Sequence, residues 1–360
     1  MDLTAPPAEP RQDDDPRELL AHAWFTIGYP PFGSAVVVTL RSDGAPALVA
    51  RVDLPRRPEH ARLLAGTIAA AAAADEAQAA VLVVAQRPAG RRPPVLTRPD
   101  RALVRAVHAR LGEAGIALAD VLVVTPGRFR SLLCVDQDCC PTEGRPLGDL
   151  RTTVTGTTLL LRGRTLVERE GDLVADVRPR PWPLDVAVGA PLPPTAALER
   201  WRRLLAARTT SPAPLPDPPP EEVAWLAPAL ADVGFRDAVL VDFLTGAADI
   251  ADEAAAGRLR GPAPVQEAET RPPDREVLEA GRALLAAVAR GAPAGWRAEA
   301  LALLAWQSWW LGSGARARLL AALALADRPG HRLALLVDEL LLRGVRPAWI
   351  RGVPSGPDMT

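Results

Sequence analysis

Lysine and asparagine are missing from the 360-residue chain, so arginine supplies every basic side chain except the four histidines. The codons of both missing residues are rich in adenine, and their absence is typical of a GC-rich genome. The abundance of arginine therefore needs no functional explanation. The formal net charge is −1. A chain without a basic excess is not expected to bind nucleic acids or acidic membranes in general.

Long apolar runs are also missing. No stretch of about 18 uncharged apolar residues occurs, so we expect no membrane span. The opening MDLTAPPAEPRQDDDP is acidic and proline-rich and lacks the basic and apolar regions of a secretory signal. Three cysteines, an odd number, do not fit the disulfide framework of a secreted protein. These absences predict a disordered tail at 1–16 and a cytoplasmic protein with reduced thiols.

Apolar patterning predicts an α/β domain over residues 17–180. Continuous apolar strands alternate with helices, and SDG at 42–44 is a hairpin signal, which together indicate a mixed, partly parallel sheet flanked by helices. The stretch 156–179 fits either a strand and a helix or two helices, and its pattern favours a second short helix from about Val167. Strands are expected near 34–40, 46–53, 80–85, 119–125 and 128–134, and helices at 17–29, 58–77 and 100–115.

Proline-rich breaks at 178–194, 211–220 and 261–273 interrupt the rest of the chain. Between and after these breaks the pattern predicts an all-helical domain over 190–350. Small residues at 305, 317 and 324 would let two antiparallel helices approach closely around 312–314, as in a tetratricopeptide-like pair or a simple helical hairpin. Helices are expected at 195–208, 221–233, 235–245, 247–258, 275–290, 294–311, 314–327 and 330–343.

All three cysteines fall within RFRSLLCVDQDCCPTEGRPL, at Cys134, Cys139 and Cys140. If strand 128–134 folds back at 135–138, Cys134 lies opposite Cys139, close enough for a disulfide after a small adjustment, and Cys140 points the other way. Three interpretations stay open: a buried reduced cluster that packs a turn, a cross-strand thiol–disulfide pair, or a zinc site. Zinc would need a fourth ligand from Asp136, Asp138 or His108. No other cofactor is predicted.

Polar side chains near the expected strand ends are candidate binding residues. Arg51 and Asp53 share a strand face and form either a structural salt bridge or a polar pocket wall. Arg128, Arg130 and Ser131 would add donors for an anion. The loop GYPPFGS at 28–34 is a turn or a ligand loop, but it lacks the P-loop pattern and precedes a strand. Nucleophile-elbow, zinc-protease and dinucleotide-binding motifs are absent.

The cysteine stretch resembles the hallmark of an uncharacterised actinobacterial family, a domain of unknown function. Its members show G-R-W-R-S-Y-x-C followed by C-C-P-x-x-G-x-P-L, with Phe129 and Leu132 as apolar exchanges in this chain. ARVDLP, LLLRGRTLVEREGDLVADVRP and the C-terminal helical stretch are also similar to the family, so the resemblance covers nearly the whole chain. It implies no reaction.

The sequence favours a non-catalytic binding or interaction protein with an unknown protein or small-molecule partner. The absence of a nucleophile or histidine motif supports this prediction. Two alternatives remain: an enzyme with a pocket built from loop 28–34, Arg51, Asp53 and the cysteine hairpin, or a regulatory protein that uses thiols or zinc. Trp306, Trp309 and Trp310 share one helix face. We expect them to belong to the core rather than to a ligand cage.

Overall fold

The computed structural model describes residues 15–88, 93–182, 187–190, 192–210, 216–259, 261, 270, 273–345, 347 and 349. Most of the tail predicted at 1–16 lies outside these residues. The described residues form two compact units, one up to Glu170 and one from Gly171 onward, which we call the first and second units. The sequence predicts domain limits of 17–180 and 190–350, and these limits stay a prediction.

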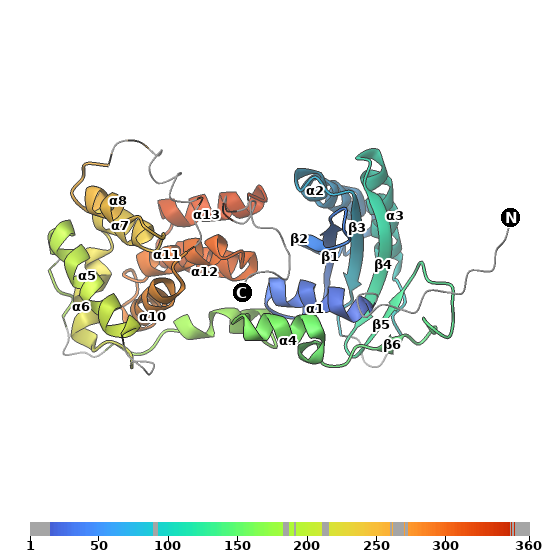
Figure 1. Ribbon diagram of the computed structural model, residues 1–360, viewed down its shortest axis with the longest axis horizontal. Helices are drawn as coiled ribbons and strands as arrows, with labels where there is room; N and C mark the ends of the chain where they lie inside the picture. Colours follow the sequence, from blue (N-terminus) through green and yellow to red (C-terminus); the bar gives the residue numbers. More distant parts are fainter. Residues whose placement is uncertain are drawn as a thin grey trace. The chain divides into compact units, whose positions relative to one another are not determined.

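The first unit contains one six-stranded sheet (Figure 1). Its order is β2-β1-β3-β4-β5-β6, and β3 and β4 pair in parallel while every other neighbouring pair is antiparallel. The β-branched run of β1 is buried along nearly its whole length, as expected for a strand covered on both faces. The predicted mixed sheet is thus confirmed. The strands are β1 (Ser34–Leu40), β2 (Pro46–Asp53), β3 (Ala79–Ala85), β4 (Ala117–Thr125), β5 (Arg128–Ser131) and β6 (Arg145–Pro146).

Helices flank this sheet. Alternate residues of β1, β3 and β4, among them Val37, Leu82 and Val121, share one core with the alanine-rich α2 and with α3. On α1, Asp15 caps the first turn and Gly28, with φ of +95°, ends the helix in the left-handed conformation. The helices are α1 (Pro16–Ile27), α2 (Ala61–Ala74), α3 (Arg98–Glu113) and α4 (Val154–Leu161), with 3-10 turns η2 (Pro58–His60) and η3 (Leu150–Thr152). The 3-10 helix η4 (Glu170–Val177) lies in the second unit apart from its first residue.

Two local predictions need correction. The strand expected at 128–134 ends at Ser131, and its chain returns as β6 rather than directly after 135–138. The second helix of 156–179 begins at Glu170 instead of Val167, and it is a 3-10 helix with non-helical backbone at Val174. Its short, irregular form explains why the sequence pattern was ambiguous.

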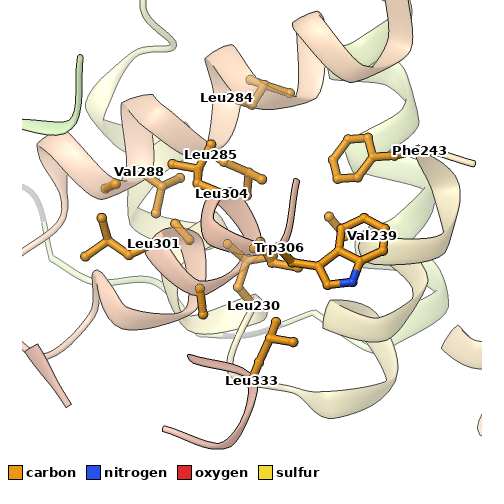
Figure 2. Close-up of a cluster of buried hydrophobic side chains, with 14 of the residues drawn as sticks. Leu230, Val239, Phe243, Leu284, Leu285, Val288, Leu301, Leu304, Trp306 and Leu333 are labelled. Atoms are coloured by element: carbon orange, nitrogen blue, oxygen red, sulfur yellow. The ribbon is translucent and has the colours of Figure 1, made fainter. Parts of the chain in front are cut away.

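The second unit is helical, as predicted. α11 and α12 form a close pair across the short loop 311–313, and the small residues Ala305, Ala317 and Ala324 are fully buried there. Figure 2 shows part of the core that α11 shares with α7, α10 and α13. The helices are α5 (Pro194–Thr209), α6 (Pro220–Ala229), α7 (Val233–Asp242), α8 (Ala248–Ala255), α10 (Arg275–Gly291), α11 (Ala298–Trp310), α12 (Gly314–Asp327) and α13 (Arg332–Leu342).

The tryptophans of α11 belong to this core. Trp306, Trp309 and Trp310 are all buried, and the rings of Trp306 and Trp310 stack with centroids 5.2 Å apart. Trp296 is the tryptophan classed as exposed among the described residues, at 39%. The prediction that the stripe is core is therefore confirmed. Across the described residues, every helix is too short or too polar to span a bilayer.

Candidate functional site

The cysteines lie in loop 132–144, which joins β5 to β6 at one edge of the sheet (Figure 1). Backbone pairing of Arg128 with Pro146 and of Phe129 with Arg145 closes the base of this loop. The Arg128 guanidinium also donates to the carbonyl oxygen of Gly144 at 2.6 Å. Gly144 has φ of +80°, and a side chain there would collide with a proline ring and a backbone oxygen. The glycine is thus required where the loop returns to the sheet.

Ser131 determines where β5 ends. Its hydroxyl donates to Asp120 Oδ1 at 2.7 Å and accepts from the backbone N–H groups of Leu133 at 3.2 Å and Cys134 at 3.0 Å. A serine side chain that bonds the backbone two and three residues later replaces the ladder hydrogen bonds of a strand with a turn. This turn positions Cys134 at the start of the loop.

Asp136 organises the other two cysteines. Its Oδ1 accepts from the backbone N–H groups of Asp138 at 2.9 Å and Cys139 at 3.4 Å, and its carbonyl oxygen accepts from the backbone of Cys140 at 2.8 Å. This is an Asx turn, in which a carboxylate mimics a backbone carbonyl. Cys139 and Cys140 therefore occupy a folded turn and not a strand.

The three thiols form one compact group. Cys139 Sγ and Cys140 Sγ are 3.8 Å apart, and all three Sγ atoms lie within 4.8 Å of one another. The Cys140 side chain is buried, that of Cys134 is half-buried and that of Cys139 is exposed to solvent. None of the three forms a disulfide. The predicted proximity of Cys134 and Cys139 is confirmed. The predicted fold-back at 135–138 and the predicted opposite direction of Cys140 are wrong. The side-chain oxygens of Ser131 and Asp136 accept hydrogen bonds from the backbone here and hold it in turns instead of paired strands.

Protonated thiols hydrogen-bond to one another in this group. Hydrogen bonds with the Cys140 and Cys134 thiols, followed by partial desolvation, raise the pKa of Cys139 to about 11. The exposed thiol is thus a weak nucleophile at neutral pH, since only a thiolate attacks. A metal ion that binds thiolates would instead favour the deprotonated form of Cys139, because metal binding displaces thiol protons.

The spacing of the sulfur atoms fits a thiolate metal site. Ligands at about 2.3 Å from a tetrahedral zinc ion are separated by about 3.8 Å, which is the separation of Cys139 and Cys140 Sγ. Of the fourth ligands considered above, Asp136, Asp138 and His108 all lie outside the group of ligand atoms found among the described residues. Among the described residues, these three sulfur atoms could hold one metal ion, and a fourth ligand would have to come from outside this group.

The remaining predicted binding residues are distributed over two distant strands. Arg51 and Asp53 lie on β2, whereas Arg128, Arg130 and Ser131 lie on β5, with three strands between them. At about 4.8 Å per strand, this separation approaches 20 Å. The structure therefore does not bring the two sets into one pocket.

Their individual contacts are local. Arg51 Nη2 lies 2.8 Å from Asp53 Oδ1, and Arg51 also bonds the Ser34 hydroxyl at 2.8 Å and lies over the Tyr29 ring. Loop 28–34 forms the turn between α1 and β1. The Arg130 Nε is buried without a hydrogen-bond partner. Any binding role for these residues remains a prediction.

A cavity of about 830 Å³ lies elsewhere in the first unit, beside the carboxyl ends of β2, β3 and β4. None of the candidate binding residues lines it. Its walls come from segments 54–56, 86–87, 93–100 and 125–126. No single motif joins these segments, so the sequence contained no signal for this cavity beyond its proline-rich loops.

Comparison with known proteins identifies the family. The family model described as a domain of unknown function, DUF4192, matches residues 16–348, which include both the sheet and the helical unit. No curated protein and no solved structure matches the chain. The resemblance seen in the sequence is confirmed at the level of the family, while the actinobacterial origin remains a prediction. The chain belongs to the DUF4192 family of domains of unknown function.

Proposed function

We propose that this protein is a non-catalytic regulatory protein that binds one soft metal ion, with zinc as the principal candidate, through Cys134, Cys139 and Cys140. The observation that carries the proposal is the convergence of three Sγ atoms within 4.8 Å of one another. Thiolate ligands favour zinc and copper(I) over magnesium and calcium, which prefer oxygen.

The loop is organised for such a site before any ion arrives. Ser131 holds the backbone at Cys134, and Asp136 holds the backbone at Cys139 and Cys140. Binding would therefore cost little ordering of the chain, which favours affinity. The exposed Cys139 leaves the ion accessible to solvent or to a partner's ligand. We infer that metal occupancy changes what this edge of the sheet binds. A cytoplasmic location, where such thiols stay reduced, is part of the proposal.

A thiol–disulfide switch is the second candidate function. It is favoured by the same proximity and by the solvent exposure of Cys139. The raised pKa of Cys139 argues against fast thiol exchange at neutral pH. The two functions predict different products on oxidation and on metal addition, so one set of measurements separates them.

The test is a titration of the full-length reduced protein with Co²⁺ and then Zn²⁺. We expect one equivalent of Co²⁺ to produce sulfur-to-cobalt absorption in the near ultraviolet, and one equivalent of Zn²⁺ to abolish it. Cys139→Ser should weaken Zn²⁺ binding at least about 100-fold, because it removes one of three sulfur ligands. Cys139 is exposed, so this substitution should leave the fold intact.

Asp138→Asn provides the matched control. Asp138 is exposed in the same loop and lies outside the group of ligand atoms, so its replacement should change Zn²⁺ affinity less than about twofold. Absence of the cobalt band, or equal affinity in wild type and Cys139→Ser, would rule out the metal site. Loss of two free thiols on mild oxidation, together with no metal binding, would support the disulfide switch instead.

A further inference from the structure

The cavity beside β2, β3 and β4 lies where three strands with the same direction end. β2 and β3 both run antiparallel to β1, and β3 runs parallel to β4, so their carboxyl ends reach one edge of the sheet. The connections that leave this edge diverge toward α2 and α3 and border an open cavity of about 830 Å³. Crevices outside the carboxyl ends of strands are the usual ligand sites of open α/β sheets.

Two cations on the cavity wall have no partner within the described residues. Arg56 follows β2 and Arg87 follows β3, and neither guanidinium forms a hydrogen bond or an ion pair there. Other arginines of the first unit are paired, including Arg51 with Asp53 and Arg151 with Glu168. Two unpaired guanidinium groups on one wall attract an anionic group, which they can bind through paired N–H donors.

Arg87 lies directly against the sheet. A Cβ atom built on Gly33 would stand only 3.0 Å from Arg87 Cγ and 3.1 Å from its Nε. Gly33 itself joins the strand ends: its N–H donates to the Ala85 carbonyl at 2.7 Å, and its carbonyl accepts from Leu54 at 2.9 Å. The arginine stem therefore packs across a backbone that is hydrogen-bonded to two strands, which restricts the positions open to its head group.

The rest of the wall is mainly apolar. Leu54 and Val95 lie on it together with four prolines of the loops, Pro55, Pro93, Pro99 and Pro126. Rigid proline and aliphatic walls suit an apolar body that is confined next to the two cations.

The side chains of Gln86 and Asp100 on the wall already form hydrogen bonds within the protein. Both N–H groups of the Gln86 amide are used, one on the Val95 carbonyl and one on Asp100 Oδ2, each at 2.9 Å. The same Asp100 oxygen accepts from the Thr97 backbone at 3.0 Å, as part of the cap that begins α3. The buried Asp100 carboxylate is thus occupied by donors, and the two guanidinium groups remain as donors for a ligand.

From this arrangement we propose that the cavity binds a small amphipathic anion, with an apolar body against the proline-rich wall and a carboxylate, sulfonate or phosphate group on Arg56 and Arg87. No cysteine lines the cavity, and the proposed site does not require metal. It also goes beyond the proposed metal function, since it assigns this protein an organic ligand class.

The test uses two fluorescent probes with the full-length protein. 8-Anilinonaphthalene-1-sulfonate has an apolar body and an anionic group, whereas N-phenyl-1-naphthylamine has a similar body without the charge. We expect saturable, one-site binding of the sulfonate. The double variant Arg56→Gln, Arg87→Gln should weaken this binding at least about tenfold, which corresponds to the loss of charge-assisted hydrogen bonds. Binding of the neutral probe should change less than about twofold.

Arg105→Gln is the matched control, because Arg105 is exposed on α3, is unpaired among the described residues and lies off the cavity wall. It should leave both affinities unchanged. Circular dichroism of each variant separates loss of binding from loss of fold. Equal sulfonate affinity in wild type and a folded double variant, or an equal loss in Arg105→Gln, would overturn the proposal. The Cys139→Ser variant should bind the sulfonate as tightly as the wild type does. This result would separate the cavity from the proposed metal site.

Discussion

At the residue scale, the absence of one side chain allows two helical segments to meet. Gly281 of α10 faces the Phe243 ring, and a Cβ atom at 281 would lie 2.1 Å from Phe243 Cε1. Phe243 is fully buried and contacts Trp201 edge-on, with ring centroids 6.1 Å apart. Because the ring is enclosed, it cannot move aside without opening the core.

Gly281→Ala should therefore destabilise the protein, although alanine is the better helix former. Overpacking costs about 1–3 kcal/mol, and the gain in helix propensity offsets at most about 1 kcal/mol. Gly66→Ala in α2 is the control, because a Cβ atom there meets nothing within 4 Å. That substitution should stabilise by up to about 1 kcal/mol. Urea unfolding measures both, and a stabilised Gly281→Ala would contradict the packing described here.

The thiol group makes a second prediction at this scale. Since neighbouring thiols raise the pKa of Cys139 to about 11, the metal-free protein should keep this thiol protonated at pH 7. Zinc binding should then release protons, and the apparent affinity should rise from pH 6 to pH 8. Calorimetry in two buffers of different ionisation enthalpy measures the release. A zinc affinity that does not depend on pH would mean that thiolates are not the ligands.

At the element scale, α11 begins without a cap from its own sequence. Its first residues follow Arg297, which makes no side-chain capping bond. The carboxylate of Asp327, at the end of α12, accepts instead from the backbone N–H groups of Gly295 at 2.9 Å, Arg297 at 3.0 Å and Ala298 at 2.9 Å. The end of one helix thus caps the start of its neighbour, which fixes the register of the α11–α12 pair.

Asp327→Ala should destabilise the second unit by about 2 kcal/mol, since it leaves three backbone donors without this acceptor. Asp338→Ala on α13 removes a carboxylate that has no partner among the described residues, and it should change stability by less than about 0.5 kcal/mol. Tryptophan fluorescence in urea compares the two. Equal effects would show that Asp327 is no more than a surface charge.

Among the elements, the buried strands are the ones that the sequence predicts well. Continuous apolar runs located β1 and β3 to within one residue, because strands covered on both faces carry their signal locally. The cysteine loop was misjudged because Ser131 and Asp136 use side-chain hydrogen bonds that alternation does not reveal. The Asp327 cap and the cavity were missed because their parts are distant in sequence and meet only after folding.

At the scale of the whole molecule, the two units can be observed separately. Of the nine tryptophans, only Trp24 belongs to the first unit. Tryptophan fluorescence therefore reports mainly on the second unit and follows its unfolding apart from that of the first.

Acid should weaken the second unit through Glu299. Burial alone would raise the pKa of this carboxyl group, but hydrogen bonds and charge from His331 and Arg328 outweigh burial and lower it. A depressed carboxyl pKa contributes stability that is fully present above the unfolded value of about 4.5 and is lost as the pH falls through the folded value. We expect fluorescence-detected stability to decrease below about pH 4.5.

Glu299→Gln isolates this contribution. The variant should be less stable at pH 7, because Arg328 and His331 lose a buried anion, and its stability should fall less steeply in acid. Asp338→Asn again provides the control. A Glu299→Gln protein with the wild-type acid profile would mean that another group controls acid unfolding of this unit.

The central claim is that three sulfur atoms of loop 132–144 bind one metal ion, and X-ray absorption at the zinc edge of the zinc-loaded, full-length protein tests it most directly. The account predicts three sulfur neighbours at about 2.3 Å and one lighter neighbour. A shell of oxygen and nitrogen alone, or one sulfur or none, would contradict it.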